Sequence, residues 1–314
     1  MTPPRKDIKN VSASINQRLL NLSQERRTTH NDILAAYGSE RFLYRLGQTD
    51  AGHQMVLKGA ALLRVWTGQE FRPTRDVDLL GHGSQDHAVI RRIVTDATAV
   101  PCPEDGLRFN PDSIRIEDIR GDQEYQGVRV KMESTLGAAR IPLQVDIGFG
   151  DVVTPAPVEG DYPTLLDLPA PRLLMYPRET AVAEKFEAMV RLGPVNSRMK
   201  DFWDVAVLAR QFGFEGAVLR QAIKATFGRR QTAITMDTPE ALQPAYYQDE
   251  ERLARWRTFQ RQVAPDAPAP TTFDAVGELL RSFLGPVRDS IAADTVFEAT
   301  WPPGGPWKTM DNDR

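Results

Sequence analysis

The sequence predicts an α+β fold, with a mixed, α/β-type sheet followed by a helical C-terminal region. Acidic and apolar residues alternate over residues 76–80, as they do in a strand with one buried face. Three further segments of strand-like composition follow between residues 113 and 149, and glycine-containing turns separate them. From residue 178 onward, apolar residues recur at helical spacing instead.

Length and composition are those of a globular protein. The chain has 314 residues, 26% of them charged, and a net charge of −3, which suits one large core or two modest ones. No apolar run is long enough to span a bilayer, and the N-terminus lacks the apolar stretch of a secretory signal. We therefore expect a cytoplasmic protein without membrane contact. Because the net charge is slightly negative, any RNA partner must meet a local basic patch.

The elements are predicted from the spacing of apolar residues. Helices are expected over residues 11–27, 29–46, 60–65, 86–99, 178–192, 196–210, 216–236, 239–263 and 273–293. After the strand at 76–80, further strands are expected over residues 113–119, 126–135 and 141–149. Six prolines between residues 151 and 177 exclude a regular helix or central strand and predict an extended crossover.

These elements suggest a chain of five parts. They are an N-terminal helical extension (1–29), a core domain (30–150), the proline-rich crossover (151–177), a helical C-terminal domain (178–300) and a flexible tail (301–314). The crossover is the clearest domain boundary.

The acidic strand is the first candidate for chemistry. Asp76 and Asp78 are two residues apart, so on a strand they project from the same face. Two adjacent carboxylates repel each other, and a fold tolerates them mainly when a cation lies between them. Hard oxygen ligands suit Mg²⁺ or Mn²⁺. The alternative is a solvated edge strand that happens to carry two acids.

A glycine turn precedes this strand. Lys58, Gly59 and Ala60 lie about twenty residues upstream, where a turn opens a short helix. Backbone N–H groups at such a turn form a phosphate site. A phosphate-binding turn followed by a metal-holding strand predicts a site for a nucleoside triphosphate.

A third acid lies on the strand at 141–149. Leu143, Val145 and Ile147 share one face of this strand, and Asp146 lies on the other. Asp146 is either the solvent side of an amphipathic strand or a further ligand of the metal, which would help to activate an attacking hydroxyl.

Four sequence blocks resemble the AbiE-type toxin nucleotidyltransferases, a branch of the DNA polymerase beta superfamily that includes the MenT-type toxins. The blocks are LKGAALLRVW (57–66), RPTRDVDLL (72–80), EKFEA (184–188) and DFWD (201–204). This chain has Ala60 and Ala61 where Gly and Thr or Ser are usual, which removes a hydroxyl but keeps the glycine turn. The arginine usually found four residues after Ala188 is absent, and Arg191 lies one position early.

The resemblance implies a polymerase-beta-like nucleotidyltransferase core and assigns roles to single residues. The implied metal ligands are Asp76, Asp78 and Asp146, which count as catalytic together with Lys185 and Asp204. The implied nucleotide-binding residues are Lys58, Gly59, Ala60, Arg72, Thr74 and Lys185. Lys185 would bind triphosphate oxygens, and a buried contact with Asp204 would fix its position.

The resemblance also implies the activity and the partners. The chain would transfer a nucleoside monophosphate from a nucleoside triphosphate to the 3′ end of tRNA, blocking translation and growth, and a cognate antitoxin would counteract it. In the family, the position of Thr74 can be modified by the antitoxin. Two alternatives stay open: a nucleotidyltransferase that modifies a protein or small molecule, and a non-catalytic module that binds a nucleotide or an antitoxin.

A cluster of cations lies beyond the family motifs. Residues 216–236 carry Arg220, Lys224, Arg229 and Arg230. Four cations on a helix are either a solvated face or a surface that follows an RNA backbone. Both interpretations stay open, and the second makes these four residues candidates for RNA binding.

Overall fold

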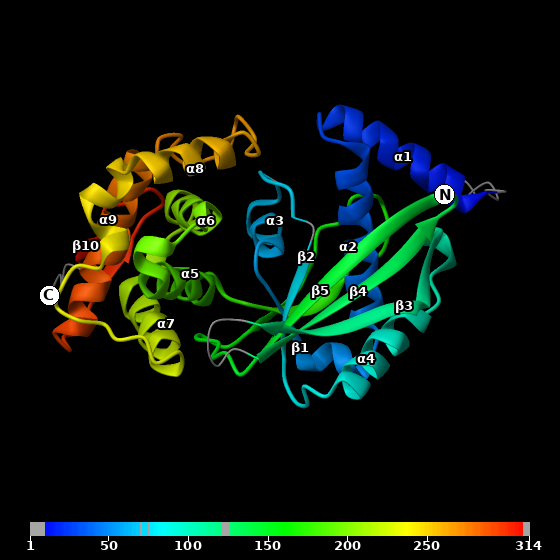
Figure 1. Ribbon diagram of the computed structural model, residues 1–314, viewed down its shortest axis with the longest axis horizontal. Coiled ribbons are helices and arrows are strands. Elements are labelled where there is room, and N and C mark those ends of the chain that lie inside the picture. Colours follow the sequence, from blue (N-terminus) through cyan, green and yellow to red (C-terminus); the bar gives the residue numbers. More distant parts are fainter. Residues whose placement is uncertain (1–9, 70, 75, 121–125, 310–314) are drawn as a thin grey trace, which may run out of the picture. The chain divides into compact units, whose positions relative to one another are not determined.

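The computed structural model describes residues 10–69, 71–74, 76–120 and 126–309 (Figure 1). It divides into two compact units, which are considered separately. The first comprises residues 1–69, 74–150 and 159–175, and the second comprises residues 70–73, 151–158 and 176–314. In the described residues no helix is long and apolar enough to cross a membrane.

A seven-stranded mixed sheet forms the centre of the first unit, with the strand order β3-β4-β5-β2-β1-β7-β6. The strands are β1 (Met55–Lys58), β2 (Asp76–Gly81), β3 (Leu107–Arg120), β4 (Gln126–Leu136), β5 (Ala139–Phe149), β6 (Val158–Asp161) and β7 (Arg172–Met175). Strands β2 and β5 are parallel, as are β1 and β7, whereas β1–β2, β3–β4 and β4–β5 are antiparallel. The α+β prediction is therefore confirmed.

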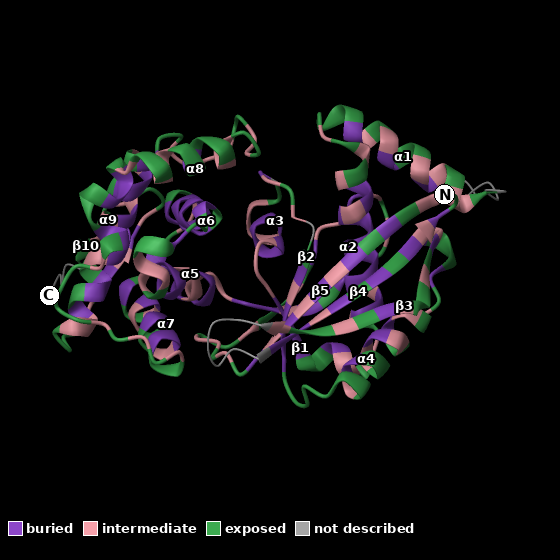
Figure 2. Cartoon of the chain, viewed as in Figure 1, coloured by how far each residue is buried: buried purple, intermediate pink, exposed green. Residues whose placement is uncertain are grey.

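Helices cover one face of this sheet. They are α1 (Val11–Glu25), α2 (His30–Gly47), α3 (Ala61–Thr67) and α4 (His87–Ala99). Helix α2 contacts β5, α4 contacts β3, and the two helices contact each other. Along β5, buried residues alternate with more exposed ones (Figure 2), because only the helix-facing side chains enter the core. The opposite face of β5 carries Gln144 and Asp146, whereas that of β1 and β2 also carries the buried Val56 and Leu80.

Helix α1 belongs to the core of the first unit. Ile15 and Leu19 are buried and cluster with Ile33 and Tyr37 of α2 and with Ile141 of β5. The described part of the N-terminal helical extension predicted over residues 1–29 thus packs against the core domain. Residues 1–9 lie outside the described residues.

The second unit is mainly helical, as predicted. Its helices are α5 (Arg178–Leu192), α6 (Met199–Gln211), α7 (Gly216–Arg229), α8 (Glu250–Gln260) and α9 (Phe273–Ala292). A small sheet of β8 (Phe214–Glu215), β9 (Ala299–Trp301) and β10 (Lys308–Thr309) accompanies them. The helix expected over 239–263 is shorter, since short 3-10 turns occupy 240–242 and 244–248; Pro244 lacks the N–H that a continuous helix needs at that point.

Two expectations for the proline-rich segment and the tail need correction. The crossover contains a sheet strand, because Leu174 and Met175 of β7 pair with β1. The tail is ordered through residue 309: Trp301 is buried, and its indole Nε1 donates to the Ala209 carbonyl at 2.7 Å. Residues 310–314 lie outside the described residues.

Two buried charged residues of α2, Glu40 and Arg41, bind the backbone of the proline-rich crossover. The Leu165 N–H donates to Glu40 Oε2 at 2.6 Å, and Arg41 Nη2 donates to the Pro169 carbonyl at 2.7 Å. Both Glu40 and Arg41 are fully buried. Burial raises the pKa of Glu40 to about 7, although Arg41 beside it acts in the opposite direction.

This raised pKa predicts a pH-dependent stability. Because the folded pKa of about 7 lies above the ordinary 4.5, the contribution of the protonated group is present below pH 4.5 and is lost as pH rises through 7. Glu40→Gln keeps an acceptor for the Leu165 N–H and cannot ionise. As pH rises from 5 to 8, the unfolding free energy of Glu40→Gln should therefore increase by about 2 to 3 kcal/mol relative to that of wild type.

Urea unfolding at several pH values measures this gain, with Glu133→Gln at an exposed position of β4 as the control. A Glu40→Gln difference that stays constant from pH 5 to pH 8 would contradict the assignment.

Candidate active site

Strand β2 presents the two predicted aspartates. Val77 and Leu79 are buried, whereas Asp76 is exposed and Asp78 is half-buried. The strand therefore has one apolar face in the core and one acidic face, as its alternation predicted. Both carboxylates project from the same side of the sheet.

The predicted phosphate-binding turn lies against Asp78. Lys58 of β1 is the register partner of Asp78, and Gly59 follows with φ of +74°. A Cβ added at Gly59 would overlap the Asp78 carboxylate and lie 2.7 Å from the Asp78 Cβ. Glycine is therefore required twice here, for the left-handed backbone and for the close approach. Helix α3 begins at Ala61 and has seven residues, and the Ala60 side chain provides no cap.

A row of charged residues crosses the open face of the sheet. In register across neighbouring strands lie Lys58, Asp78, Asp146, Arg129 and Glu117. Residues in register on adjacent strands point to the same face, and the strands are about 4.8 Å apart. Asp146 therefore lies directly beside Asp78, as the sequence predicted for a third acid on a neighbouring strand.

Arg129 binds the carboxylate of Asp146 in a bidentate ion pair. Arg129 Nε donates to Asp146 Oδ1 at 2.8 Å, and Arg129 Nη2 donates to Oδ2 at 2.7 Å. The hydrogen bond to Asp146 raises the pKa of Arg129, and the charges of Asp146 and Asp76 act in the same direction. The partner that Asp146 needs is thus an arginine on β4.

The positions of Asp76, Asp78 and Asp146 bear on the prediction that all three bind a metal ion. Asp76 and Asp78 are hard oxygen donors two residues apart on one strand, which suits Mg²⁺ or Mn²⁺. Asp146 has both oxygens bound to Arg129. Among the residues that the structure describes, no group of three or more His, Cys, Asp or Glu side chains is arranged to hold a metal ion. Asp76 and Asp78 therefore suit a divalent cation, and the role of Asp146 as a third ligand stays a prediction.

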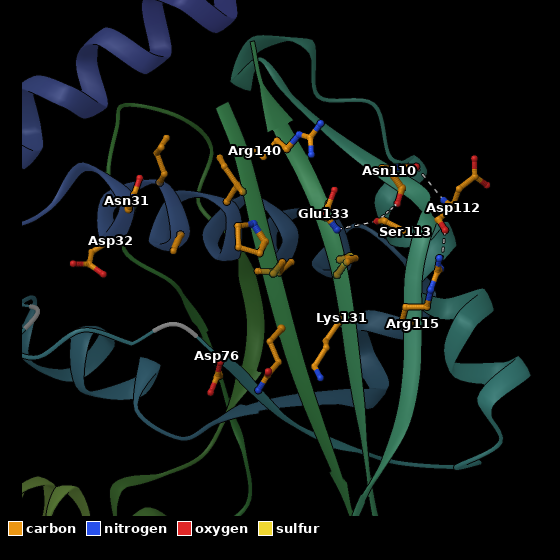
Figure 3. A pocket seen from close by; sticks show the side chains of 17 residues that line it. Asn31, Asp32, Asp76, Asn110, Asp112, Ser113, Arg115, Lys131, Glu133 and Arg140 are labelled. Atoms are coloured by element: carbon orange, nitrogen blue, oxygen red, sulfur yellow. Dashed lines mark hydrogen bonds between the residues drawn. The ribbon is translucent and has the colours of Figure 1, made fainter. Parts of the chain in front are cut away.

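A pocket of about 950 Å³ opens beside Asp76 (Figure 3). Gln144 and Lys131 continue from Asp76 along the same sheet face, in register with it. Asn110 and Ser113 approach from β3, and Ser113 Oγ accepts from the Glu133 N–H at 2.8 Å. Amide, hydroxyl, cationic and carboxylate groups, the last including Asp32, Asp112 and Glu133, thus line a pocket of the size that small-molecule ligands occupy.

The other predicted site residues come together in the second unit. Lys185 of α5 donates to Asp204 Oδ2 at 2.7 Å and to Asp201 Oδ1 at 3.1 Å. Arg72 donates to both Asp204 oxygens, from Nε at 2.9 Å and from Nη2 at 2.8 Å. Arg198 Nε donates to Asp201. The predicted Lys185–Asp204 contact is confirmed.

These groups stay charged although they are buried. Burial alone would raise the pKa of Asp204, but Lys185 and Arg72 outweigh it and hold that pKa below its usual range. Burial alone would lower the pKa of Lys185, but Asp204 and Asp201 raise it. Asp204 is completely buried. Its carboxylate therefore anchors two cations, and the nucleotide-binding role of Arg72 stays a prediction.

One of the four cations of the basic segment lies in a buried cluster and not on the surface. The Arg230 side chain is 11% exposed and pairs with Asp151, Glu184 and Glu187. Arg220 and Lys224 both pair with Asp294. Arg230 is thus part of a buried ion-pair cluster, contrary to prediction. RNA binding by Arg220, Lys224 and Arg229 stays a prediction.

Sequence reasoning missed Arg129. The alternation of apolar and charged residues in VRVKME (128–133) indicates which face of β4 it occupies. Only the β4–β5 register places it opposite Asp146.

Comparisons with known proteins identify the family. Two solved structures from Helicobacter pylori, JHP933 and a candidate nucleotidyltransferase, are each 14% identical to this chain, with a TM-score of 0.44. They cover 88% of this chain, which in turn covers 94% and 97% of theirs. No curated protein matches the chain. The model of the AbiEii nucleotidyl transferase toxin, type IV toxin–antitoxin system, matches residues 41–280. This protein therefore belongs to the AbiEii family of nucleotidyltransferase toxins, for which an antitoxin partner is implied.

Proposed function

We propose that this protein transfers a nucleoside monophosphate from a nucleoside triphosphate to an acceptor hydroxyl, and that the acceptor is the 3′ end of tRNA. Such a reaction would block aminoacylation and arrest growth. The motif resemblance supports the acceptor, and the arrangement of the site supports the donor. The cognate antitoxin would oppose this activity.

One observation carries the proposal: the Gly59 turn lies directly against the acidic strand. Because a Cβ at Gly59 would overlap Asp78, the backbone amides predicted to bind phosphates are next to the predicted metal carboxylates. In nucleotidyl transfer, the triphosphate and its metal must bind together. The pocket beside Asp76 offers room for the rest of the nucleotide.

Each residue has a defined task in this proposal. Asp76 and Asp78 would hold a divalent cation, which when bound polarises phosphate oxygens as a Lewis acid. The amides at Gly59 and Ala60 would bind the β- and γ-phosphates, with Lys58 as a neighbouring point charge. The motif resemblance implies that Lys185 binds triphosphate oxygens. Lys185→Ala tests this role separately from the roles of the two aspartates.

The decisive experiment incubates the purified protein with total tRNA, Mg²⁺ and each nucleoside triphosphate in turn, labelled at the α-phosphate. We expect label on tRNA from at least one nucleotide, and at least a 10³-fold loss in the double variant Asp76→Asn, Asp78→Asn, because the charge that stabilises the transferring phosphate is gone. Asp118→Asn is the matched control, since Asp118 is an exposed acid on β3 that pairs with His87.

Label on tRNA that persists in the double variant would contradict the proposed site. Label on a protein or small molecule, with none on any RNA, would replace tRNA as the acceptor and leave the transferase assignment in place.

A further inference from the structure

Resting on the proposed function, we infer that the carboxylates of this chain hold one divalent cation, between Asp76 and Asp78, and that Arg129 bound to Asp146 supplies the positive charge that a second cation would bring. Asp146 is then a positioning residue for Arg129 and not a metal ligand.

The first step is the geometry at Asp146. Both of its oxygens accept from one guanidinium, at 2.8 and 2.7 Å, and Gln144 Nε2 lies 3.4 Å from Oδ2. A bidentate, charge-assisted pair of this kind is among the strongest that side chains form. The Asp146 side chain is only 17% exposed. A metal ion that bound there would have to use the oxygen lone pairs that Arg129 leaves, on a carboxylate that is largely enclosed, or displace the guanidinium.

The second step is the nature of the guanidinium charge. Arginine stays protonated in proteins and has no acceptor atom, so Arg129 cannot vacate Asp146 by losing a proton. Enzymes with two metals hold the ions about 3.5–4 Å apart by means of shared carboxylates. Here both oxygens of the third carboxylate are instead held by a guanidinium from β4, the strand on the other side of β5 from Asp76 and Asp78.

The third step is charge balance. Asp76, Asp78 and Asp146 carry three negative charges, and Lys58 beside Asp78 and Arg129 beside Asp146 already supply two positive charges, so a single divalent cation outweighs the remaining negative charge. The charge of Asp76 also acts on Arg129, so the guanidinium belongs electrostatically to the acidic group as a whole. A second divalent cation would increase this excess of positive charge.

The neighbouring cation on β4 serves as an internal comparison. Lys131 lies two residues from Arg129 on the same face and pairs with Glu117 at 2.6 Å. It is cationic and bound to a carboxylate, like Arg129, but its partner lies on β3. Lys131→Gln therefore removes a similar charge without affecting Asp146.

Mn²⁺ binding tests the inference without reference to activity. Full-length wild type and variants are titrated with Mn²⁺, and bound ion is measured by electron paramagnetic resonance and calorimetry. We expect one Mn²⁺ per chain in wild type. Asp146→Asn and Lys131→Gln should keep this stoichiometry, with Kd within threefold of wild type. In Arg129→Gln, the freed Asp146 should raise affinity at least tenfold or add a second ion.

A double variant distinguishes an effect on metal binding from a loss of folding. Asp146→Asn leaves Arg129 without its carboxylate, so the double variant Arg129→Gln, Asp146→Asn removes both charges together. It should bind one Mn²⁺ with wild-type affinity, and thermal unfolding verifies its fold.

Two Mn²⁺ ions per wild-type chain, or a tenfold weaker affinity in Asp146→Asn and in the double variant, would overturn the inference and restore Asp146 as a ligand. Absence of Mn²⁺ binding by wild type would overturn it as well. The proposed function fails separately, on the transfer assay: wild type that binds one Mn²⁺ but transfers no nucleotide would refute the function and leave the single-cation site in place.

Discussion

Replacing Asp204 with alanine should lower the unfolding free energy by about 3–5 kcal/mol, the range observed when one partner of a buried ion pair is removed. Asp204 is completely buried and accepts hydrogen bonds from Lys185 and Arg72. Without its carboxylate, both cations lose their shared partner inside the second unit. Lys185 keeps Asp201, whereas the Arg72 guanidinium loses its bidentate acceptor.

Urea unfolding measures this loss, and Asp294→Ala is its matched control. Asp294 also binds two cations, Arg220 and Lys224, but its side chain is 81% exposed. Exposed pairs of this kind contribute about 0–1 kcal/mol. Equal effects of the two substitutions would show that the Asp204 cluster is solvated, contrary to its burial in the second unit.

Gly59→Ala should both destabilise the protein and remove nucleotide transfer. A residue with a side chain in the left-handed region costs about 1–2 kcal/mol, and overpacking costs about 1–3 kcal/mol more. The new methyl group would meet Asp78 at its Cβ as well as at its carboxylate, so the side chain cannot escape by rotating its end. A displacement of Asp78 by about 1 Å should lower the rate of transfer roughly 10²-fold.

The same helix provides the control for this prediction. Gly68, at the other end of α3, has φ of +71°, and a Cβ added there would meet nothing within 4 Å. Gly68→Ala should therefore cost about 1–2 kcal/mol and leave transfer intact. If both alanines had the same effect on transfer, the contact between Gly59 and Asp78 would be irrelevant to the chemistry.

Local sequence patterns predicted those parts of the fold that depend on local periodicity. The alternation in Asp76–Leu80 specified a strand with its acids on one face, and helical spacing predicted α5 over the observed Arg178–Leu192. Strand β7 escaped prediction because it is four residues long and lies between Pro171 and Pro177. Its place in the sheet depends on pairing with β1, which no local pattern encodes.

The same limit applies to the candidate site. The motif EKFEA and the aspartates of α6 led to the Lys185–Asp204 contact, which the structure contains. The arginine partners of Asp146 and Asp204 were not predicted. Arg129 is 17 residues from Asp146 across a hairpin, and Arg72 is 132 residues from Asp204. Such pairs are determined by strand register and helix packing, not by the spacing of residues along the chain.

Because the two units alternate along the chain, the position of a chain break or recombination point matters for the fold. The chain passes from one unit to the other after residues 69, 73, 150, 158 and 175. A break after Gly150 would strip β6 and β7 from the sheet and leave β1 with an unpaired edge, which invites aggregation. Recombination that exchanges the helical half at Gly150 would therefore also have to supply strands β6 and β7 for the sheet of the first unit.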